Sequence, residues 1–559
     1  MSISMSQKET LGSIFKGNAF VIPTYQRKYS WTDTERSALW SDIDESMRND
    51  LNHFLGTLSF KQNETEGLST DTVYEVIDGQ QRLTTVFILL SVLIDSLPDS
   101  ALADAQRNAF IGSHGNLRLR PLGSDGAFLS KVLFAYDEIG FDGLTKRSER
   151  FLYQAKREFR SFVSGLTAGE IERWIKFIRD RIEVLVFNVN SQAQAVKMFS
   201  IINDRGLPLR ILDKTKSILM LYSTLHLDEE LNEFINERFE SIFDSYDDLL
   251  VHRDALGILG RLDENTVFTH HYFSSRRFFP DSWNNKNSAD TIFSNLKKRC
   301  QDMKDDQRLL RDFIRAYLDD LAQFSVAYSK LIQEAGQDEL LHKYFVKLEF
   351  TGTLYPLIVR LYLQGKLRDL IDILETTEVR VYKTRGTNPI ADAYWLSSDV
   401  AEVDISVDEI KSRLTFLNEK FMSDHVFRNY LDADIYGNGA VRYLLAERDG
   451  GTFLIDEYRD FQVEHIFSKD PQFDVVEFGF EDDYDYEKNR LGNLTLLEGR
   501  LNERVGNVAP SSKVSGYIES GFETTRNLAG KIQHTGLRKE DVDARREGII
   551  QYCLERFRI

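Results

Sequence analysis

The sequence contains little cysteine and little proline. Its two cysteines, Cys300 and Cys553, lie far apart in the 559-residue chain and form neither a CxxC zinc motif nor a disulfide framework. Any bound metal is therefore expected on oxygen and nitrogen ligands. Because the chain has only nine prolines and no long low-complexity stretch, little of it is expected to be disordered.

Long apolar runs are also missing. The longest, residues 86–94, is much shorter than the roughly 20 residues that cross a bilayer. The first residues lack the basic start and apolar core of a signal peptide. These features predict a cytoplasmic protein without a membrane partner.

Basic residues are fewer than acidic ones, and the formal net charge is −18 at pH 7. This argues against a uniformly basic surface for indiscriminate nucleic-acid binding. A local basic groove can still bind DNA phosphates on an acidic protein. The densest basic stretch, residues 146–160, has six lysines and arginines against two glutamates, and a solvated helix face explains it better than a nucleic-acid site.

The hydrophobic pattern predicts a predominantly helical α+β protein. A helix capped by Thr32 or Asp33 is expected through Arg48, followed by paired strands over 54–60 and 73–77. The second of these strands leads into a helix that ends near residue 96. Asp213 is predicted to cap a later helix.

The remaining sequence completes a three-domain prediction, in keeping with roughly 100–200 residues per domain. Helix-like spacing of apolar residues dominates 228–400, and residues 384–399 are predicted to interrupt it. The expected division is a sensing domain over 1–225, a helical linker over 226–404 and a final domain over 405–559.

One motif joins a predicted strand to a predicted helix through the sequence VYEVIDGQQR, residues 73–82. Gly79 permits a tight turn, and the first amides of the following helix attract an anion. Arg82 can bind phosphate, Asp78 can hold Mg²⁺ or a water, and Gln80 and Gln81 supply donors and acceptors. A plain strand–turn–helix, with Asp78 as a cap and Arg82 in a salt bridge, explains the pattern equally well.

The DGQQR sequence has two companions in the chain, IPTYQRKYSW at 22–31 and FSIINDRGLPL at 199–209. In this order the three motifs resemble the N-terminal domain of GmrSD-type modification-dependent restriction enzymes, over residues 10–220. The resemblance implies a ParB/sulfiredoxin-like NTPase that binds a nucleoside triphosphate at residues 78–82. It also implies that Asn203, Arg205 and Gly206 form a second part of the nucleotide site. No Walker A, GxSxG or HExxH motif competes with this assignment.

The segment Tyr25, Gln26 and Arg27 carries a separate expectation. The chain is similar to relatives that sense phosphorothioate-modified DNA, and in those relatives this motif region is implicated in recognition. An aromatic ring and an arginine beside a DNA backbone group suit that task. The alternative is that Tyr25, Tyr29 and Trp31 are core aromatics.

A second motif surrounds His465. The run FQVEHIF over 461–467 is strand-like, and after a loop LGNLTLL over 491–497 is strand-like again, before a helix start at 498–504. This is the order of a ββα-metal nuclease. Hydrolysis of a phosphodiester needs a base such as histidine and a cation such as Mg²⁺ or Mn²⁺. One histidine near two asparagines is by itself more typical of a structural residue.

The sequences VEHIFSKD and NRLGNLTLLEGRLNERVGN, followed by Lys513 and Tyr517, resemble the HNH-like C-terminal domain of the same restriction enzymes over 460–520. The resemblance implies that His465 is the general base. Asn493 would pin the loop so that the histidine ring is oriented, and Asn489 competes for this role.

The metal site implied by the resemblance contains Glu464, His465 and Asn502. Asn502 stands where many HNH enzymes have a final histidine. Lys513 could contact the scissile phosphate, and its alternative is an ordinary surface lysine.

Together these motifs predict a DNA endonuclease of a bacterial anti-phage defence system that nicks or cuts modified phage or foreign duplex DNA. NTP hydrolysis by the first domain would be coupled to cleavage in a direction that the sequence leaves open, as it does the oligomeric state. Two alternatives remain: a nucleotide-gated DNA-binding or interaction protein without cleavage, which the asparagine at position 502 in place of histidine leaves open, and a toxin-like RNase.

Overall fold

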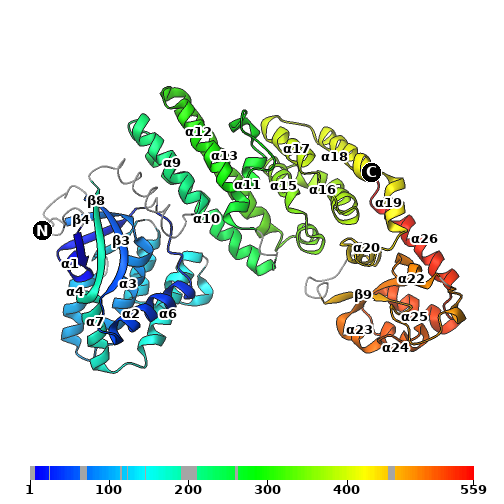
Figure 1. The fold of residues 1–559 in the computed structure, drawn as a ribbon, viewed down its shortest axis with the longest axis horizontal. Coiled ribbons are helices and arrows are strands. Elements are labelled where there is room, and N and C mark those ends of the chain that lie inside the picture. Colours follow the sequence, from blue (N-terminus) through cyan, green and yellow to red (C-terminus); the bar gives the residue numbers. More distant parts are fainter. Residues whose placement is uncertain are drawn as a thin grey trace. The chain divides into compact units, whose positions relative to one another are not determined.

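The computed structural model describes residues 7–23, 26–62, 72–113, 116–122, 124–144, 146–189, 210–257, 262–450, 460–481 and 483–559. It divides into two compact units (Figure 1). The first unit comprises Met1–Val251, Arg261–Thr269 and Ser288–Ser329, and the second comprises the rest. None of the helices in the described ranges combines the length and the hydrophobicity that a membrane span requires.

A six-stranded mixed sheet organises the first unit, with the strand order β1-β8-β3-β4-β2-β7. The sheet strands are β1 (Gln7–Thr10), β2 (Asn18–Ile22), β3 (His53–Gln62), β4 (Thr72–Asp78), β7 (Leu119–Pro121) and β8 (Ile182–Val189). The predicted strands over 54–60 and 73–77 pair antiparallel as β3 and β4. β2 runs parallel to both β4 and β7, which places the end of β2 beside the end of β4.

Helices make up most of the rest of the first unit. The helices that precede β8 in the sequence are α1 (Leu11–Phe15), α2 (Asp33–Arg48), α3 (Gln80–Asp95), α4 (Ser100–Phe110), α5 (Ser124–Phe134), α6 (Arg147–Val163) and α7 (Ala168–Arg181). The following helices are α9 (Ile211–His226), α10 (Asn232–Leu256), α11 (Glu264–Phe273), α12 (Ala289–Met303) and α13 (Gln307–Glu334). The predicted cap of α2 is confirmed, because Thr32 and Glu35 form a reciprocal capping box.

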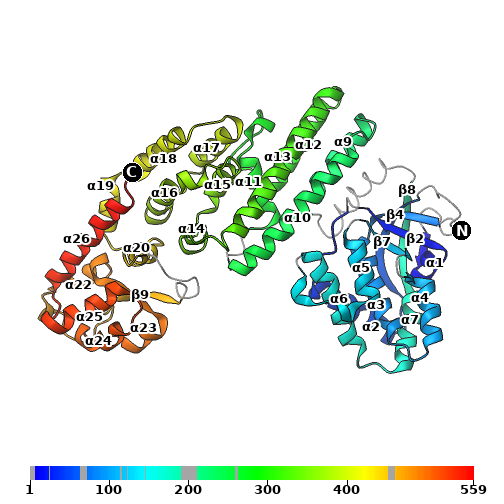
Figure 2. The ribbon, with the colours of Figure 1, turned by 180° about the vertical axis from the view of Figure 1, so that it is seen from behind.

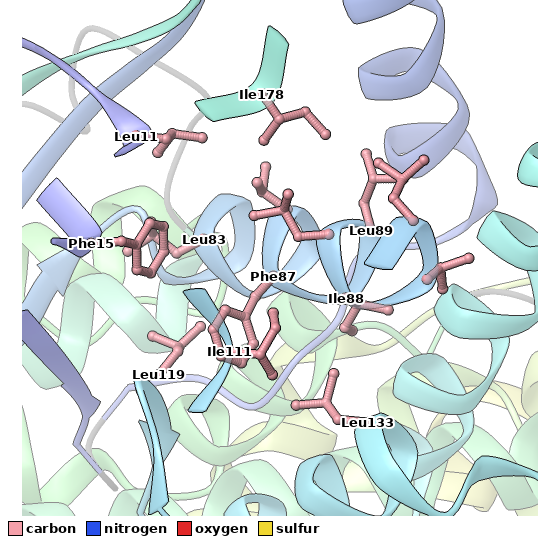
Figure 3. Close-up of a cluster of buried hydrophobic side chains, with 14 of the residues drawn as sticks. Leu11, Phe15, Leu83, Phe87, Ile88, Leu89, Ile111, Leu119, Leu133 and Ile178 are labelled. Carbon is pink, nitrogen blue, oxygen red and sulfur yellow. The ribbon is translucent and has the colours of Figure 1, made fainter. Parts of the chain in front are cut away.

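Helix α3 is the buried centre of the first unit. Every residue from Leu83 to Ile94 is buried, as expected for a helix that is apolar on all sides. Leu83, Phe87 and Leu89 lie among side chains of the surrounding elements (Figure 3). Helices α4, α6 and α7 pack around α3, and Figure 2 shows them from behind. This packing holds the first turn of α3, and therefore the DGQQR motif, in a fixed place.

One local prediction was wrong, and another was right only in part. Asp213 does not cap α9, because the cap position is occupied by Arg210 and Asp213 lies in the first helical turn. The predicted interruption at 384–399 is mostly helix, since α17 (Ile390–Glu402) begins directly after Pro389. Proline is tolerated at the start of a helix, so the break is confined to the residues before it.

The second unit is helical around one small antiparallel hairpin. Its helices include α15 (Tyr355–Leu363), α16 (Leu367–Thr377), η6 (Glu378–Thr384), α18 (Val407–Met422), α19 (Asp424–Leu431) and α20 (Val441–Arg448). Strands β9 (Phe461–His465) and β10 (Leu494–Glu498) pair antiparallel, with His465 opposite Leu494. Four helices follow: α23 (Gly499–Val505), α24 (Pro510–Ile518), α25 (Glu523–Thr535) and α26 (Lys539–Arg556). The order strand–strand–helix agrees with prediction, and the predominantly helical α+β class is confirmed.

Candidate active site

The DGQQR motif turns the chain from β4 into α3. Gly79 has a φ of 93°, which glycine adopts without steric cost. A Cβ atom there would overlap the Leu58 side chain. Gly79 is the cap of α3, and none of the side chains in the described part of the chain caps the first-turn amides. Such amides have no partner within the helix and favour an anion.

The two glutamines of the motif hold the 26–30 segment through its backbone. The Gln80 amide donates to the Arg27 carbonyl at 2.8 Å. Gln81 donates to the Lys28 carbonyl at 3.1 Å and accepts from the Ser30 amide at 2.9 Å. These contacts bring two of the three ordered motifs together, which sequence order alone could not establish.

A small, open pocket lies at this junction. Its walls include the side chains of Gln26, Arg27, Lys28, Gln80, Gln81 and Thr84. Gln26 also donates to the Ile77 carbonyl at 2.9 Å, which anchors it to the end of β4. Tyr29 is a core residue, buried with its hydroxyl 2.9 Å from that of Thr85. Tyr25, Asn203, Arg205 and Gly206 lie outside the described residues.

Arg82 and Asp78 form an ion pair at 3.2 Å, and Arg82 also donates to the Leu55 carbonyl at 3.2 Å. A Cβ atom at Gly56 would overlap the Arg82 guanidinium, so the glycine makes room for it. Burial raises the pKa of Asp78. The structure therefore shows the salt bridge of Arg82 that a plain strand–turn–helix would have. Both side chains are already engaged in contacts within the protein.

The cations of the pocket face carboxylates from the helices that follow the sheet. Arg27 lies 3.6 Å from both Asp213 on α9 and Glu264 on α11. Lys28 pairs with Asp244 on α10. Burial, with the Asp213 carboxylate nearby, raises the pKa of Glu264 to about 7. None of these contacts was predicted from the sequence, because a single acidic residue in an amphipathic helix carries no signal of its distant partner.

His465 ends strand β9 and is 6% exposed. Its Nε2 lies 3.0 Å from Oδ1 of Asn489, whose Nδ2 donates to Asp434 at 3.0 Å. Because a carboxylate only accepts, the Asn489 carbonyl must face the ring. Nε2 therefore carries the hydrogen, and Nδ1 is the basic nitrogen. Burial lowers the pKa of His465, which leaves the ring neutral at pH 7.

Asn493 holds the loop on both sides of this site. Its Oδ1 accepts from the Phe467 amide at 2.8 Å, and its Nδ2 donates to the carbonyls of Phe467 and Lys488, each at 2.8 Å. It is 1% exposed. The two roles considered for Asn493 and Asn489 are thus divided: Asn493 fastens the loop and Asn489 contacts the ring.

Each of the three predicted metal ligands has another hydrogen-bond partner in the structure. Glu464 is bound by the Lys513 ammonium at 2.6 Å and the Tyr517 hydroxyl at 3.1 Å. Asn502 donates to Gln462 at 2.6 Å. Successive residues of a strand point to opposite faces, so Glu464 and His465 diverge. Within the described ranges, no group of three or more His, Cys, Asp or Glu side chains could hold a metal ion.

Lys513 differs from both of its predicted roles. It is 1% exposed and donates to Glu464 and to the His465 carbonyl, each at 2.6 Å. A buried lysine with a carboxylate partner is neither a surface lysine nor free for a phosphate. Sequence spacing could not separate these cases, because the pairing depends on how α24 packs against β9.

Both regions fall inside matched family domains. The chain matches the GmrSD restriction endonuclease N-terminal domain over residues 8–220 and the GmrSD restriction endonuclease C-terminal domain over residues 418–551. These matches together cover more than half of the sequence. The chain belongs to the GmrSD restriction endonuclease family. No curated protein matches it.

The GmrSD C-terminal domain of this chain begins upstream of the HNH-like motif and includes Asp434 and Tyr436. Tyr436 packs on the His465 ring with 4.3 Å between the ring centroids. Neither residue was singled out in the sequence, because both lie about thirty positions before the histidine. The wall of the histidine site is therefore built partly from a segment that precedes the ββα motif.

Proposed function

We propose that this protein is an endonuclease of modified DNA in which His465 is the general base. The observation that carries this proposal is the hydrogen-bonded series His465–Asn489–Asp434. It gives a neutral imidazole with a defined basic nitrogen at the end of the ββα hairpin, within a restriction endonuclease family. A base that is neutral at working pH can accept a proton from water.

In the proposed reaction Nδ1 of His465 removes a proton from a water molecule. The water oxygen bonds to the phosphorus, and the bond from phosphorus to one ester oxygen breaks. That oxygen leaves with the bonding electron pair and takes a proton from solvent. Asn489 orients the ring throughout, and Asp434 holds the Asn489 amide in place by accepting its N–H.

The predicted Mg²⁺ or Mn²⁺ stays a proposal for the assay to test. Glu464, His465 and Asn502 do not fit a shared cation, because Glu464 already binds Lys513 and Asn502 binds Gln462. We therefore assign the proton transfers from water to the chain's own residues alone.

The pocket of the first unit is the proposed site of recognition. Arg27 and Lys28 suit a phosphate or phosphorothioate group, and the uncapped first turn of α3 suits the phosphates of an NTP. In this proposal NTP hydrolysis there regulates cleavage, and the protein acts in anti-phage defence in the cytoplasm.

The test is conversion of supercoiled plasmid to nicked or linear DNA, with plain and phosphorothioate-modified plasmids, in Mg²⁺, in Mn²⁺ and in EDTA. We expect His465→Ala to lower the cleavage rate by about 100-fold or more, the usual contribution of a general base. His534→Ala, an exposed histidine on α25, serves as the control and is expected to behave as wild type. Equal activity of wild type and His465→Ala would refute the assignment, and preference for an RNA competitor would favour an RNase.

A further inference from the structure

Arg545 on α26 donates hydrogen bonds to the backbone of the segment that follows Asn489. Its Nη1 donates to the carbonyls of Leu491, Gly492 and Leu494 at 3.0, 2.9 and 2.6 Å. Three carbonyls that converge on one guanidinium fix the path of η8 (Leu491–Asn493). None of the motifs in the sequence includes Arg545, which lies more than 20 residues beyond the HNH-like region that ends near 520.

The backbone of η8 also lies directly against α26. A Cβ atom at Gly492 would overlap the Val542 carbonyl oxygen and lie 2.9 Å from the Arg546 Cβ. Arg545 follows Val542 by three positions, which places it close to the same helix face. The glycine contact and the guanidinium contacts therefore hold the same few residues.

The neighbouring Arg546 contacts the two chain segments that supply Asn489 and Asp434. It lies 3.1 Å from Glu487 and 2.9 Å from Asp432. Glu487 precedes Asn489 by two positions, and Asp432 precedes Asp434 by two. Helix α26 is thus attached to both segments whose side chains complete the series behind His465.

We propose that Arg545 is a positioning residue of the nuclease site: by fixing the carbonyls of Leu491, Gly492 and Leu494, it holds Asn489 and Asn493 in the places that orient His465. This inference rests on the proposed function for its catalytic consequence. A small displacement of a catalytic group lowers the reaction rate strongly. Loss of the Arg545 contacts should therefore lower kcat and leave DNA binding nearly unchanged.

The experiment uses the full-length chain with Arg545→Ala and Arg545→Lys. The matched control is Arg556→Ala, on the same helix, which removes the ion pairs of Arg556 with Glu375 and Glu447 and no contact with η8. The readouts are kcat and KM for plasmid nicking, thermal stability, and the ¹⁵N signature of the His465 tautomer. His465→Ala identifies the His465 resonances.

We expect Arg545→Ala to lower kcat by about 10- to 100-fold with KM changed by less than about twofold, and to populate both ring tautomers. Arg545→Lys should recover part of kcat and most of the Nε2–H tautomer. Arg556→Ala should lose stability while keeping the wild-type tautomer and kcat.

A wild-type tautomer and kcat in Arg545→Ala would overturn the inference, as would equal changes in Arg556→Ala. The tautomer measurement does not require cleavage. If His465→Ala cleaves DNA as well as wild type, the proposed function fails, whereas a tautomer that responds to Arg545 still shows the positioning role.

Discussion

Amide side chains do much of the positioning in both candidate sites. Gln80 and Gln81 bind the backbone of the 26–30 segment, and Asn493 binds the backbone on both sides of the histidine loop. An amide offers a donor and an acceptor on one rigid group, so it can fasten two chain segments without a charge. The motifs DGQQR and NRLGN therefore encode the geometry of the sites as much as their chemistry.

Glu264 gives the first unit a defined pH dependence. Burial raises its pKa from an ordinary 4.5 to about 7. Between these values the folded protein keeps a proton that the unfolded chain has lost. The contribution of Glu264 to the free energy of unfolding therefore falls as the pH rises through this range.

We expect Glu264→Gln, which cannot titrate, to reduce this dependence. Between about pH 5.5 and about pH 8 the Tm of wild type should fall relative to that of the variant, as thermal unfolding at the two pH values would show. Glu503→Gln, at an exposed carboxyl of α23, is the control. A constant Tm difference between wild type and Glu264→Gln at the two pH values would contradict the assignment.

At the level of elements, the close approach of η8 to α26 is a packing constraint that can be measured. We expect Gly492→Ala to destabilise the second unit by about 1–3 kcal/mol, because the added methyl group overlaps the Val542 carbonyl. Gly530→Ala on α25 is a matched control, since no described atom beyond its chain neighbours and its own helix backbone lies within 4 Å of its Cβ position. There alanine should be neutral or stabilise the helix by up to about 1 kcal/mol. Urea unfolding of both variants provides the comparison, and equal effects would show that the packing at Gly492 is looser than described.

The elements that could be predicted from the sequence are those whose residues are apolar throughout or alternate regularly between apolar and polar. Helix α3 is apolar on all sides and β4 leads into it through Asp-Gly, so both were visible in the pattern. The end of β9 at His465 was visible for the same reason. The family resemblance supplied the connection to a nuclease, and the domain matches confirm that family.

The partners of these elements could not be predicted. Which face of β9 receives Lys513, and which loop supplies Asp434 to Asn489, depends on tertiary packing rather than on local propensity. Helix α26 is rich in charged residues, and nothing in its pattern marks Arg545. The partners of the predicted metal ligands could not be predicted either, since the contacts of Glu464 with Lys513 and of Asn502 with Gln462 depend on tertiary packing.

At the scale of the whole molecule, the two candidate sites belong to different units, and the net charge is −18. An acidic protein binds DNA through a few local cations, so few phosphates are neutralised and non-specific binding is weak. In the first unit Arg27 and Lys28 already face carboxylates. A phosphate must compete with those carboxylates, which favours selective ligands over indiscriminate DNA.

The central claim is that His465 acts through Asn489 rather than through a cation shared with Asn502. The most direct measurement compares the nicking rates of Asn489→Ala and Asn502→Ala on modified plasmid. We predict a loss of about 10- to 100-fold for Asn489→Ala and a rate within about threefold of wild type for Asn502→Ala, whose amide donates to Gln462. A large loss in Asn502→Ala with normal activity in Asn489→Ala would contradict it.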